Sequence, residues 1–356
     1  MDVAALRAEF PVLSELTYLN AGTAGPWPAA ASRAVAGVLD VAEREGRLGS
    51  YGLVQRELSD RLRGAYAALL GAAPSEVALT TCTSDGIARV VAGLDLAAGD
   101  EVLTSEGEHP GLLGPLGAAI AQRGITVREV PLARIAEEVG ARTRLVACSH
   151  VHWGTGEIAP GELRDAGVPV LLDGAQGVGA VPVDVRGLGC AFYAGSGQKW
   201  MCGPIGLGML WIDPAWQERV VPRGPAFPNL AAPNDGLAYP LQPDARRHDA
   251  PGLSTERCAA ALAAHDVLAA AGWDAVHARA AALAAQLADA LPDVLPRGDT
   301  TLVTWHHDDP LAERERLAGL GITVRDIPGR PWLRASLGAW NVEDDIERLL
   351  AALKRG

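Results

Sequence analysis

The sequence contains little that would tie the protein to a membrane or a nucleic acid. No apolar run reaches the roughly 20 residues that a bilayer-spanning helix needs. The N-terminus has no basic stretch followed by an apolar one, so no secretory signal is expected. The net charge of −12 argues against partners rich in phosphate, such as nucleic acids and anionic membranes.

Cysteine and lysine are scarce as well. The five cysteines are scattered and odd in number, and none stands in a CxxC pair or at zinc-site spacing from a histidine. This pattern predicts reduced thiols, a cytoplasmic location and no metal site. Because lysine is rare, a lysine that lies between apolar segments stands out.

The length of 356 residues predicts one large domain plus a smaller one, and a hydrophobic content of 49% is enough for a sizeable core. Apolar runs of strand length alternate with segments of helical periodicity. Strands are expected at 77–80, 101–104, 127–130, 145–149, 169–173, 192–193 and 206–212, and helices at 3–9, 29–45, 53–70, 86–94, 110–122 and 133–139. The alternation predicts an α/β fold with a mixed, mainly parallel sheet.

The C-terminal third has a different pattern. Residues 222–251 are rich in Pro, Asn, Asp and Arg and predict a long loop. Helices are then expected at 255–271, 273–291, 310–317 and 342–353, with strands at 301–305, 322–325 and 332–336. We expect a large α/β domain over 15–245 and a small α+β domain built from 1–14 and 246–356.

Lys199 is the most informative residue. It follows an apolar strand-like stretch, in a turn rich in Gly and Ser, and a second apolar strand ends at Asp173. A buried amine near a carboxylate suits a Schiff base with pyridoxal 5'-phosphate (PLP), with the acid protonating the ring nitrogen. Gln176 could then donate to the phenolic oxygen of the ring. The alternatives are a solvated surface lysine and an aspartate that caps the next turn.

Polar groups at other predicted strand ends fit the same cofactor, because ligands of such sheets bind beyond the carboxyl ends of the strands. The turn 81–86 could bind phosphate at a helix start, or be an ordinary N-cap. His109 could lie flat on the ring, or be a loop histidine. His150 and His152 lack further ligands for a metal. Arg334, within an apolar strand, could clamp a substrate carboxylate or form a structural salt bridge.

Taken together, the motifs resemble fold-type I PLP-dependent enzymes of the class V aminotransferase and cysteine desulfurase group. The ordered set is Glu108-His109, the run Asp173–Gln176, the run Ser196–Lys199, and Arg334 with a following Asn341. The resemblance covers nearly the whole chain. It implies an aspartate aminotransferase-like fold and a homodimer with active sites at the subunit interface, where residues 249–254 reach the partner's phosphate.

The resemblance also implies a role for each site residue. Lys199 forms the Schiff base and Asp173 pairs with the ring nitrogen, and these two with His109 are the expected catalytic residues. Cofactor contacts are expected from Thr83, Ser84, His109, Asp173, Gln176, Ser196, Gln198 and Lys199. Contacts to an amino-acid substrate are expected from Arg334, Trp153 and Asn20.

Departures from the desulfurase pattern narrow the expected function. Desulfurases of this group carry a mobile cysteine shortly before the C-terminal arginine, and residues 326–332 contain none. Gln198 stands where a histidine is usual, and Trp153 where an asparagine is usual.

The motifs are closer to the cystine and cysteine C–S lyase branch. The shared elements are Phe10-Pro11, Thr17-Tyr18, Asn20, 108–111, 149–156, 173–176 and 199–204. We therefore expect a carbon–sulfur β-lyase acting on cystine, cysteine or a cysteine conjugate. A class V aminotransferase or an epimerase-like enzyme is the first alternative, and a catalytically silent PLP-fold binding protein is the second.

Overall fold

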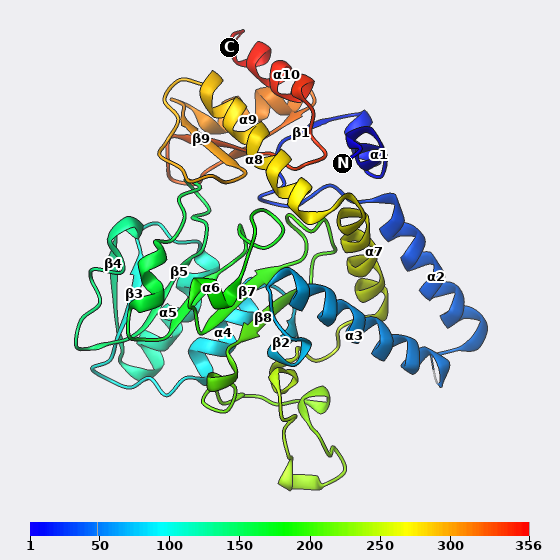
Figure 1. Ribbon diagram of the computed structural model, residues 1–356, viewed down its shortest axis with the longest axis vertical. Helices are drawn as coiled ribbons and strands as arrows, with labels where there is room; N and C mark the ends of the chain where they lie inside the picture. The colour runs from blue at the N-terminus through cyan, green and yellow to red at the C-terminus, as the bar shows by residue number, and fades with distance from the viewer. Residues whose placement is uncertain (48, 356) are drawn as a thin grey trace.

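A seven-stranded sheet forms the centre of the computed structural model, which describes residues 1–47 and 49–355 (Figure 1). Its strands, in spatial order, are β2 (Val77–Thr80), β8 (Gly208–Ile212), β7 (Phe192–Ser196), β6 (Val170–Asp173), β5 (Thr143–Ser149), β3 (Glu101–Ser105) and β4 (Thr126–Val130). Only β8 runs antiparallel to its neighbours in this sheet. The predicted mixed, mainly parallel sheet is therefore confirmed.

Helices cover both faces of this central sheet, because successive strand residues point to opposite sides. Leu171 packs with α4 (Thr83–Gly93) and α5 (Pro110–Arg123) on one face. Leu172 packs with α3 (Ser50–Leu69), α6 (Val185–Leu188) and α7 (Thr255–Ala271) on the other. The near-continuous apolar strands of the sequence are thus explained by burial on two sides.

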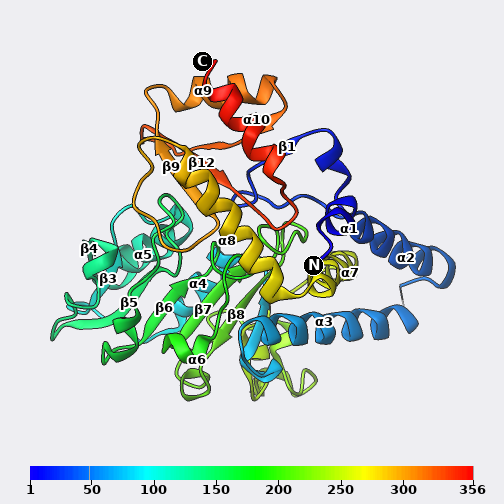
Figure 2. The ribbon, with the colours of Figure 1, turned by 45° about the horizontal axis from the view of Figure 1, so that its top comes forward.

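The second, smaller sheet lies beyond the carboxyl edge of the central one (Figure 2). Its order is β11 (Arg325–Asp326), β12 (Trp332–Ser336) and β9 (Leu302–His306), all antiparallel. It packs with α8 (Trp273–Ala290), α9 (Pro310–Gly319) and α10 (Glu343–Leu353) around one apolar core. We call it the C-terminal sheet.

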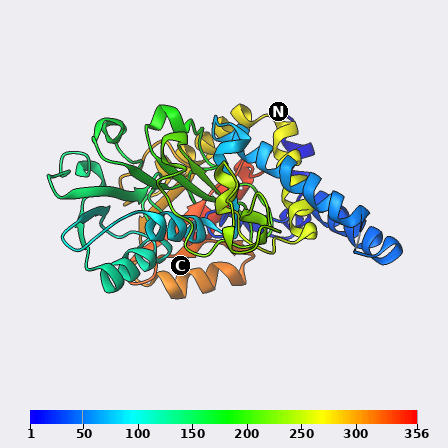
Figure 3. The ribbon, with the colours of Figure 1, turned by 90° about the horizontal axis from the view of Figure 1, so that it is seen from below.

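The N-terminal segment joins this C-terminal part of the chain. β1 (Thr17–Tyr18) pairs with β10 (Ile322–Thr323), and Arg7, in α1 (Val3–Ala8), binds Asp345 at 3.0 Å. In contrast, α7 packs on α2 (Ala29–Glu45) and α3, whose outer halves extend from the body of the molecule (Figure 3). The division of the chain at residue 246 stays a prediction.

Two predicted elements are wrong. The helix expected at 133–139 is only a 3₁₀ turn, Leu132–Arg134, because so short a segment makes few helical hydrogen bonds and Arg128 binds the main-chain oxygen of Glu138. The strand expected at 322–325 is split into β10 and β11, because its two halves pair with different strands.

No helix among residues 1–47 and 49–355 is long and apolar enough to cross a membrane.

The long segment between β8 and α7 is fastened at both ends to the central sheet unit. Near its start the Val221 N–H donates to Gly93 O at 3.0 Å, and near its end the Ala250 N–H donates to Leu79 O at 2.8 Å. Arg63 of α3 makes a two-pronged ion pair with Asp249, at 2.9 and 2.7 Å, and both side chains are buried. Asp249 also accepts the Leu79 N–H.

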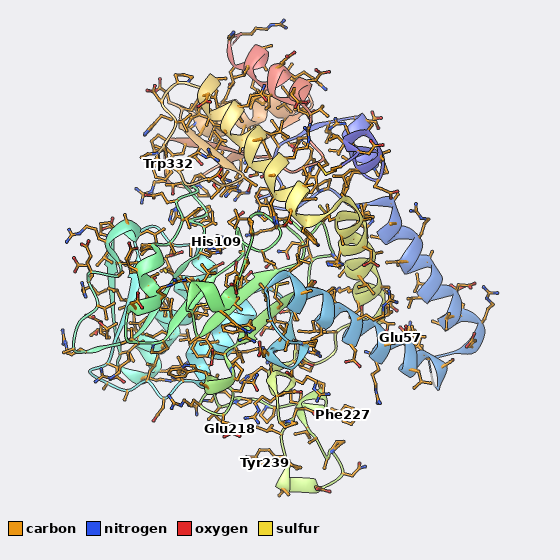
Figure 4. The ribbon with its side chains drawn as sticks, in the orientation of Figure 1. Glu57, His109, Glu218, Phe227, Tyr239 and Trp332 are labelled. Carbon is orange, nitrogen blue, oxygen red and sulfur yellow. The ribbon has the colours of Figure 1, made fainter. Side chains whose placement is uncertain are left out.

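The Arg63–Asp249 pair generates a stability prediction. Arg63→Ala leaves a buried carboxylate without its cation, so we expect a loss of about 3–5 kcal/mol in the free energy of unfolding. Arg61→Ala on the same helix is the control, since its pair with Glu57 (labelled in Figure 4) is exposed and is worth about 1 kcal/mol or less. Urea unfolding measures both, and equal losses contradict the prediction.

Candidate active site

All of the expected site residues except Asn20 line one cavity of about 260 Å³ at the carboxyl edge of the central sheet. We call it the inner cavity. Its wall is made of Gly22, Thr23, Cys82, Thr83, Ser84, His109, Trp153, Asp173, Ala175, Gln176, Ser196, Gln198, Lys199, Arg325 and Arg334. The ends of β2, β6 and β7 supply most of it, and the C-terminal sheet closes it with its two arginines.

Asp173 ends β6 and is buried, with Ser149 of β5 beside it in register. Its Oδ1 accepts the Ala175 N–H at 2.9 Å. Burial raises the pKa of Asp173 to about 6, although the nearby Lys199 and the Ala175 N–H lower it in part. A buried carboxylate with a raised pKa lacks a positive partner, and a protonated pyridine nitrogen would supply one.

Lys199 lies in the turn that follows β7 and lines the same cavity. The sequence holds one other lysine, Lys354, near the C-terminus. Burial lowers the pKa of Lys199 to about 8, which the Asp173 carboxylate offsets in part and Arg334 enhances. A lysine with a lowered pKa is partly neutral near neutral pH, as a nucleophilic or basic amine must be.

The start of α4 forms the polar end of the cavity. The Thr83 N–H donates to Ser196 Oγ at 3.0 Å, and the two hydroxyl oxygens lie 2.6 Å apart. Ser84 sits against Gly111 so closely that a Cβ on Gly111 would overlap its hydroxyl. Gln198 Oε1 is buried and has no hydrogen-bond partner among the described residues. Free N–H groups at a helix start, with hydroxyls beside them, suit a phosphate.

His109 begins α5, and its Nδ1 accepts the Gly111 N–H at 3.0 Å. Its ring meets the Trp153 ring edge-on, with centroids 5.2 Å apart. Partial burial, with the nearby Lys199 and Arg334 cations, lowers the pKa of His109 to about 4. The neutral ring faces the inner cavity, where a planar cofactor could stack on it.

Gln176 is fixed by two hydrogen bonds. Its amide nitrogen donates to Gly22 O at 2.8 Å, and its amide oxygen accepts the Trp200 indole N–H at 2.9 Å. An amide nitrogen has two hydrogens, so one stays available to a ligand. The expected donor to a phenolic oxygen is therefore present and held in place.

Arg334 is buried in β12 without an acid. It donates to the Trp153 main-chain oxygen and reaches Thr23 Oγ1 at 3.5 Å, while its Nε has no partner among the described residues. Burial lowers the pKa of Arg334 to about 9, and Arg325 lowers it further. The structural salt bridge weighed as the alternative does not form within the described part of the chain.

Asn20 does not line the inner cavity. It forms an isolated bridge with Ser336, two positions beyond Arg334, so it lies behind the arginine. The Asp249 carboxylate binds Arg63 of the same chain. The contribution of residues 249–254 to a partner's phosphate site stays a prediction.

The two histidines of the run 149–156 have protein partners. His150 Nδ1 lies 2.9 Å from the Tyr193 hydroxyl, and His152 bridges Gly107 O and the Thr155 hydroxyl at 3.1 Å each. Within residues 1–47 and 49–355, no group of three possible metal ligands occurs.

Sequence reasoning missed Arg325, and it named Glu108 only within the Glu108-His109 motif, without a role. Arg325 lines the inner cavity from β11, where it stands opposite Arg334 in the antiparallel pair. Glu108 is buried and accepts the Ser149 N–H at 2.6 Å and the hydroxyls of Ser149 and Ser105. It fastens the loop that carries His109 to the ends of β3 and β5. The sequence offered two signals for these residues: Arg325 is a second arginine near the C-terminal strand, and Glu108 is an acid directly before His109.

The comparisons with known proteins agree with this geometry. The family described as aminotransferase class-V matches residues 47–300. The chain is 30% identical to an isopenicillin N epimerase of Amycolatopsis lactamdurans, over 95% of this chain and 94% of the relative. It is also 30% identical to a probable cysteine desulfurase of Pseudomonas aeruginosa, over 98% and 97%.

Solved structures are similar over the whole chain. The cystine C–S lyase C-DES, in complex with its reaction product cysteine persulfide, has a TM-score of 0.89 at 28% identity and covers 97% of this chain and 98% of its own. The cysteine desulfurase CsdA from Escherichia coli has a TM-score of 0.87 at 24% identity, with coverage of 100% and 98%. The predicted fold is therefore confirmed.

The raised pKa of Asp173 generates a prediction for the cofactor-free protein. A carboxyl whose pKa is raised on folding, from 3.8 to about 6, stabilises the fold at low pH and loses that effect as the pH rises through 6. From pH 4 to pH 8 the wild type should lose about 2 kcal/mol of unfolding free energy relative to Asp173→Asn. Urea unfolding across this range measures the difference.

The control for Asp173→Asn is Asp308→Asn, at an exposed position. It should follow the wild type at each pH. If the Asp173→Asn and wild-type curves stay parallel from pH 4 to pH 8, Asp173 does not titrate as an unpaired buried acid.

Proposed function

The chain belongs to the aminotransferase class-V family, and we propose that within it the protein is a carbon–sulfur β-lyase acting on cystine, cysteine or a cysteine conjugate. At the coarser level it is a PLP-dependent enzyme of the kind that includes cysteine desulfurases and C–S lyases. The finer assignment depends on the residues of the inner cavity and on the segment at its mouth.

The donor set fits PLP at each part of the molecule. Thr83, Ser84, Ser196 and Gln198 would hold the phosphate, Asp173 the ring nitrogen and Gln176 the phenolic oxygen. His109 would cover one ring face, and Lys199 would carry the cofactor. When bound, PLP supplies an electron sink for a carbanion at the substrate Cα. The raised pKa of the buried Asp173 carboxyl supports this fit.

Two residues then act on the substrate. Arg334 would bind the α-carboxylate by two parallel hydrogen bonds, since no acid in the described chain occupies it. Lys199 would remove the Cα proton, for which its pKa of about 8 suits it near neutral pH. Asp173, held as a carboxylate by the ring N–H, would keep the ring nitrogen protonated.

Elimination follows when the Cβ–S bond breaks and its electron pair leaves with the sulfur. The thiolate takes up a proton, and the three-carbon remainder reacts with one water. The balanced reaction converts a cysteine conjugate and water into a thiol, pyruvate and ammonia. With cystine, the departing group is a persulfide.

The observation that carries the lyase assignment is the segment between β11 and β12. Residues 327–331 form a tight turn, closed by Ile327 N–H to Trp332 O and Arg330 N–H to Ile327 O, at 3.0 and 3.1 Å. The segment contains no cysteine. Sulfur transfer to an enzyme thiol from this segment is therefore not available, which supports release of the sulfur with the product.

Arg325 adds support. Like charges directly opposite each other in an antiparallel pair are destabilising, yet Arg325 stands opposite Arg334 at the cavity. A substrate with more than one carboxylate, such as cystine, would relieve this repulsion.

The relatives described as isopenicillin N epimerases favour an epimerase as the second candidate. An aminotransferase on the same scaffold is the other form of this alternative. All three reactions begin with removal of the Cα proton and differ in where the electrons and protons go next.

The assay that separates these candidates uses the enzyme loaded with PLP and offered cystine, cysteine or an S-substituted cysteine. We expect pyruvate and ammonia in equal amounts with the sulfur product, which is hydrogen sulfide from cysteine, a thiol from a conjugate and a persulfide from cystine, and no activity in Lys199→Ala. Amino-group transfer to a 2-oxo acid without pyruvate, or racemisation without thiol release, refutes the lyase assignment.

Arg334 gives a second prediction. Arg334→Lys keeps the charge but loses the planar fork, so kcat/KM for amino-acid substrates should fall about 10- to 100-fold, mainly through KM. The absorbance of bound PLP should stay unchanged, because Arg334 is assigned to the substrate. Arg348→Lys, at an exposed position of α10, is the control. A fall in kcat alone contradicts this role.

We further propose a cytoplasmic homodimer. The cysteines of the described chain are all free thiols, as in reducing compartments. Phe227, Leu237 and Tyr239 are exposed on the long segment between β8 and α7, two of them labelled in Figure 4. Exposed apolar residues gathered on one projection support a protein contact.

A further inference from the structure

A second cavity of about 620 Å³ adjoins the inner cavity and shares three wall residues with it: His109, Trp153 and Arg325. We call it the outer cavity. The rest of its wall comes from 106–108, Pro110, 131–133, His152, 154–155, Glu157, 327–328, Arg330 and Trp332. It therefore lies between the large sheet unit and the C-terminal sheet, and His109 and Trp332, labelled in Figure 4, come from opposite sides.

The two cavities differ in volume, so they can hold different parts of a substrate. Sites for drug-sized ligands have volumes of roughly 300–1,000 Å³. The inner cavity, at about 260 Å³, is smaller than this, so the cofactor and the amino-acid part of a substrate would fill it. A group attached to the substrate's sulfur must extend beyond it. The outer cavity, which opens beside His109 and Trp153, has the volume to receive such a group.

The wall of the outer cavity combines apolar surface with cations. The Trp332 ring lies under the Arg330 guanidinium, 5.3 Å from ring centroid to Cζ. Ile327, Pro328 and Leu132 add apolar surface. Within the described residues Arg330 has no acid within ion-pair distance, so its charge is available to a ligand.

Three acids also line the outer cavity. Glu108 is buried and accepts the hydroxyls of Ser105 and Ser149, and Glu157 accepts the Thr155 hydroxyl at 3.0 Å. Glu106 is exposed. None of the three pairs with Arg325 or Arg330 in the described part of the chain. Arg325 and Arg330 therefore have no ion-pair partner in the cavity wall and can bind an incoming anion.

From this geometry we propose that the outer cavity is the subsite for the group on the substrate's sulfur, and that it selects cysteine S-conjugates with a bulky, carboxylate-bearing substituent. The proposal rests on the lyase function proposed above and names its substrate class. In the elimination, the outer cavity holds the departing thiol, and Arg330 binds the carboxylate that the thiol carries.

The test compares three substrates: cysteine, S-phenylcysteine and S-(4-carboxyphenyl)cysteine. Pyruvate formation gives kcat/KM for each. The Arg330→Gln variant should lower kcat/KM about ten-fold for the carboxyphenyl conjugate, the effect of losing one charged hydrogen bond, and leave S-phenylcysteine unchanged. Ala133→Trp, which fills the outer cavity from its wall, should lower kcat/KM ten-fold or more for both conjugates and leave cysteine unchanged.

Two matched variants serve as controls. Arg348→Gln and Ala141→Trp make the same changes at exposed positions outside both cavities. Each should behave as the wild type with all three substrates. Since the comparisons are made between variants for one substrate, the intrinsic reactivity of each leaving group cancels.

A binding measurement separates this proposal from the proposed function. Isothermal titration of the holoenzyme with 4-mercaptobenzoate, the departing thiol, should show binding that Ala133→Trp abolishes and Arg330→Gln weakens. If no substrate yields pyruvate but 4-mercaptobenzoate binds in this way, the lyase function fails and the subsite stands. If cysteine yields pyruvate but Ala133→Trp affects all three substrates equally or none, the subsite is refuted.

Discussion

The main constraint on this structure is that three ionisable groups lie buried in one cavity, and none of them has an ion-pair partner among the described residues. Asp173, Lys199 and Arg334 each have a pKa displaced by burial, to about 6, 8 and 9. Burying such charged groups away from water is unfavourable unless a ligand pairs with their charges and forms hydrogen bonds with them. The surrounding hydrogen bonds hold them in place, and the protein's stability must come from elsewhere, including the bidentate pair of Arg63 with Asp249.

Much of this could be predicted because the chemistry lies at strand ends. The apolar runs of the sequence predicted β5, β6 and β7, and the carboxyl ends of such strands meet at one edge of a sheet. The proximity of Asp173 and Lys199 could therefore be predicted. Arg325 could not, since the strand expected at 322–325 divides into β10 and β11, and only the pairing of β11 with β12 places Arg325 opposite Arg334. Glu108 was named only as part of a motif, because a single acid in a loop carries no periodicity that would indicate its role. The helix expected at 133–139 failed because a seven-residue segment makes few helical hydrogen bonds to offset a costly nucleus.

The cavity is assembled from two parts of the chain that do different work. The central sheet supplies the groups that suit the cofactor, while the C-terminal sheet supplies Arg325 and Arg334, which suit the substrate. One substitution can therefore alter substrate recognition without touching the cofactor. This division explains how a single scaffold supports proteins described as epimerases, desulfurases and lyases.

The segment between β8 and α7 is anchored to the central sheet unit at Val221 and at Asp249–Ala250. Its interior supports the second anchor, because the buried Asn229 amide donates to the main-chain oxygens of Arg246 and Asp249. The tip is closed separately, by the Ala231 N–H donating to Pro240 O at 2.8 Å. Lengthening such a loop costs little, because closure entropy grows only with the logarithm of the number of residues. Insertions between residues 232 and 239 should therefore leave the register of β2 and the geometry of the cavity as they are, which makes this tip a natural point of divergence between homologues.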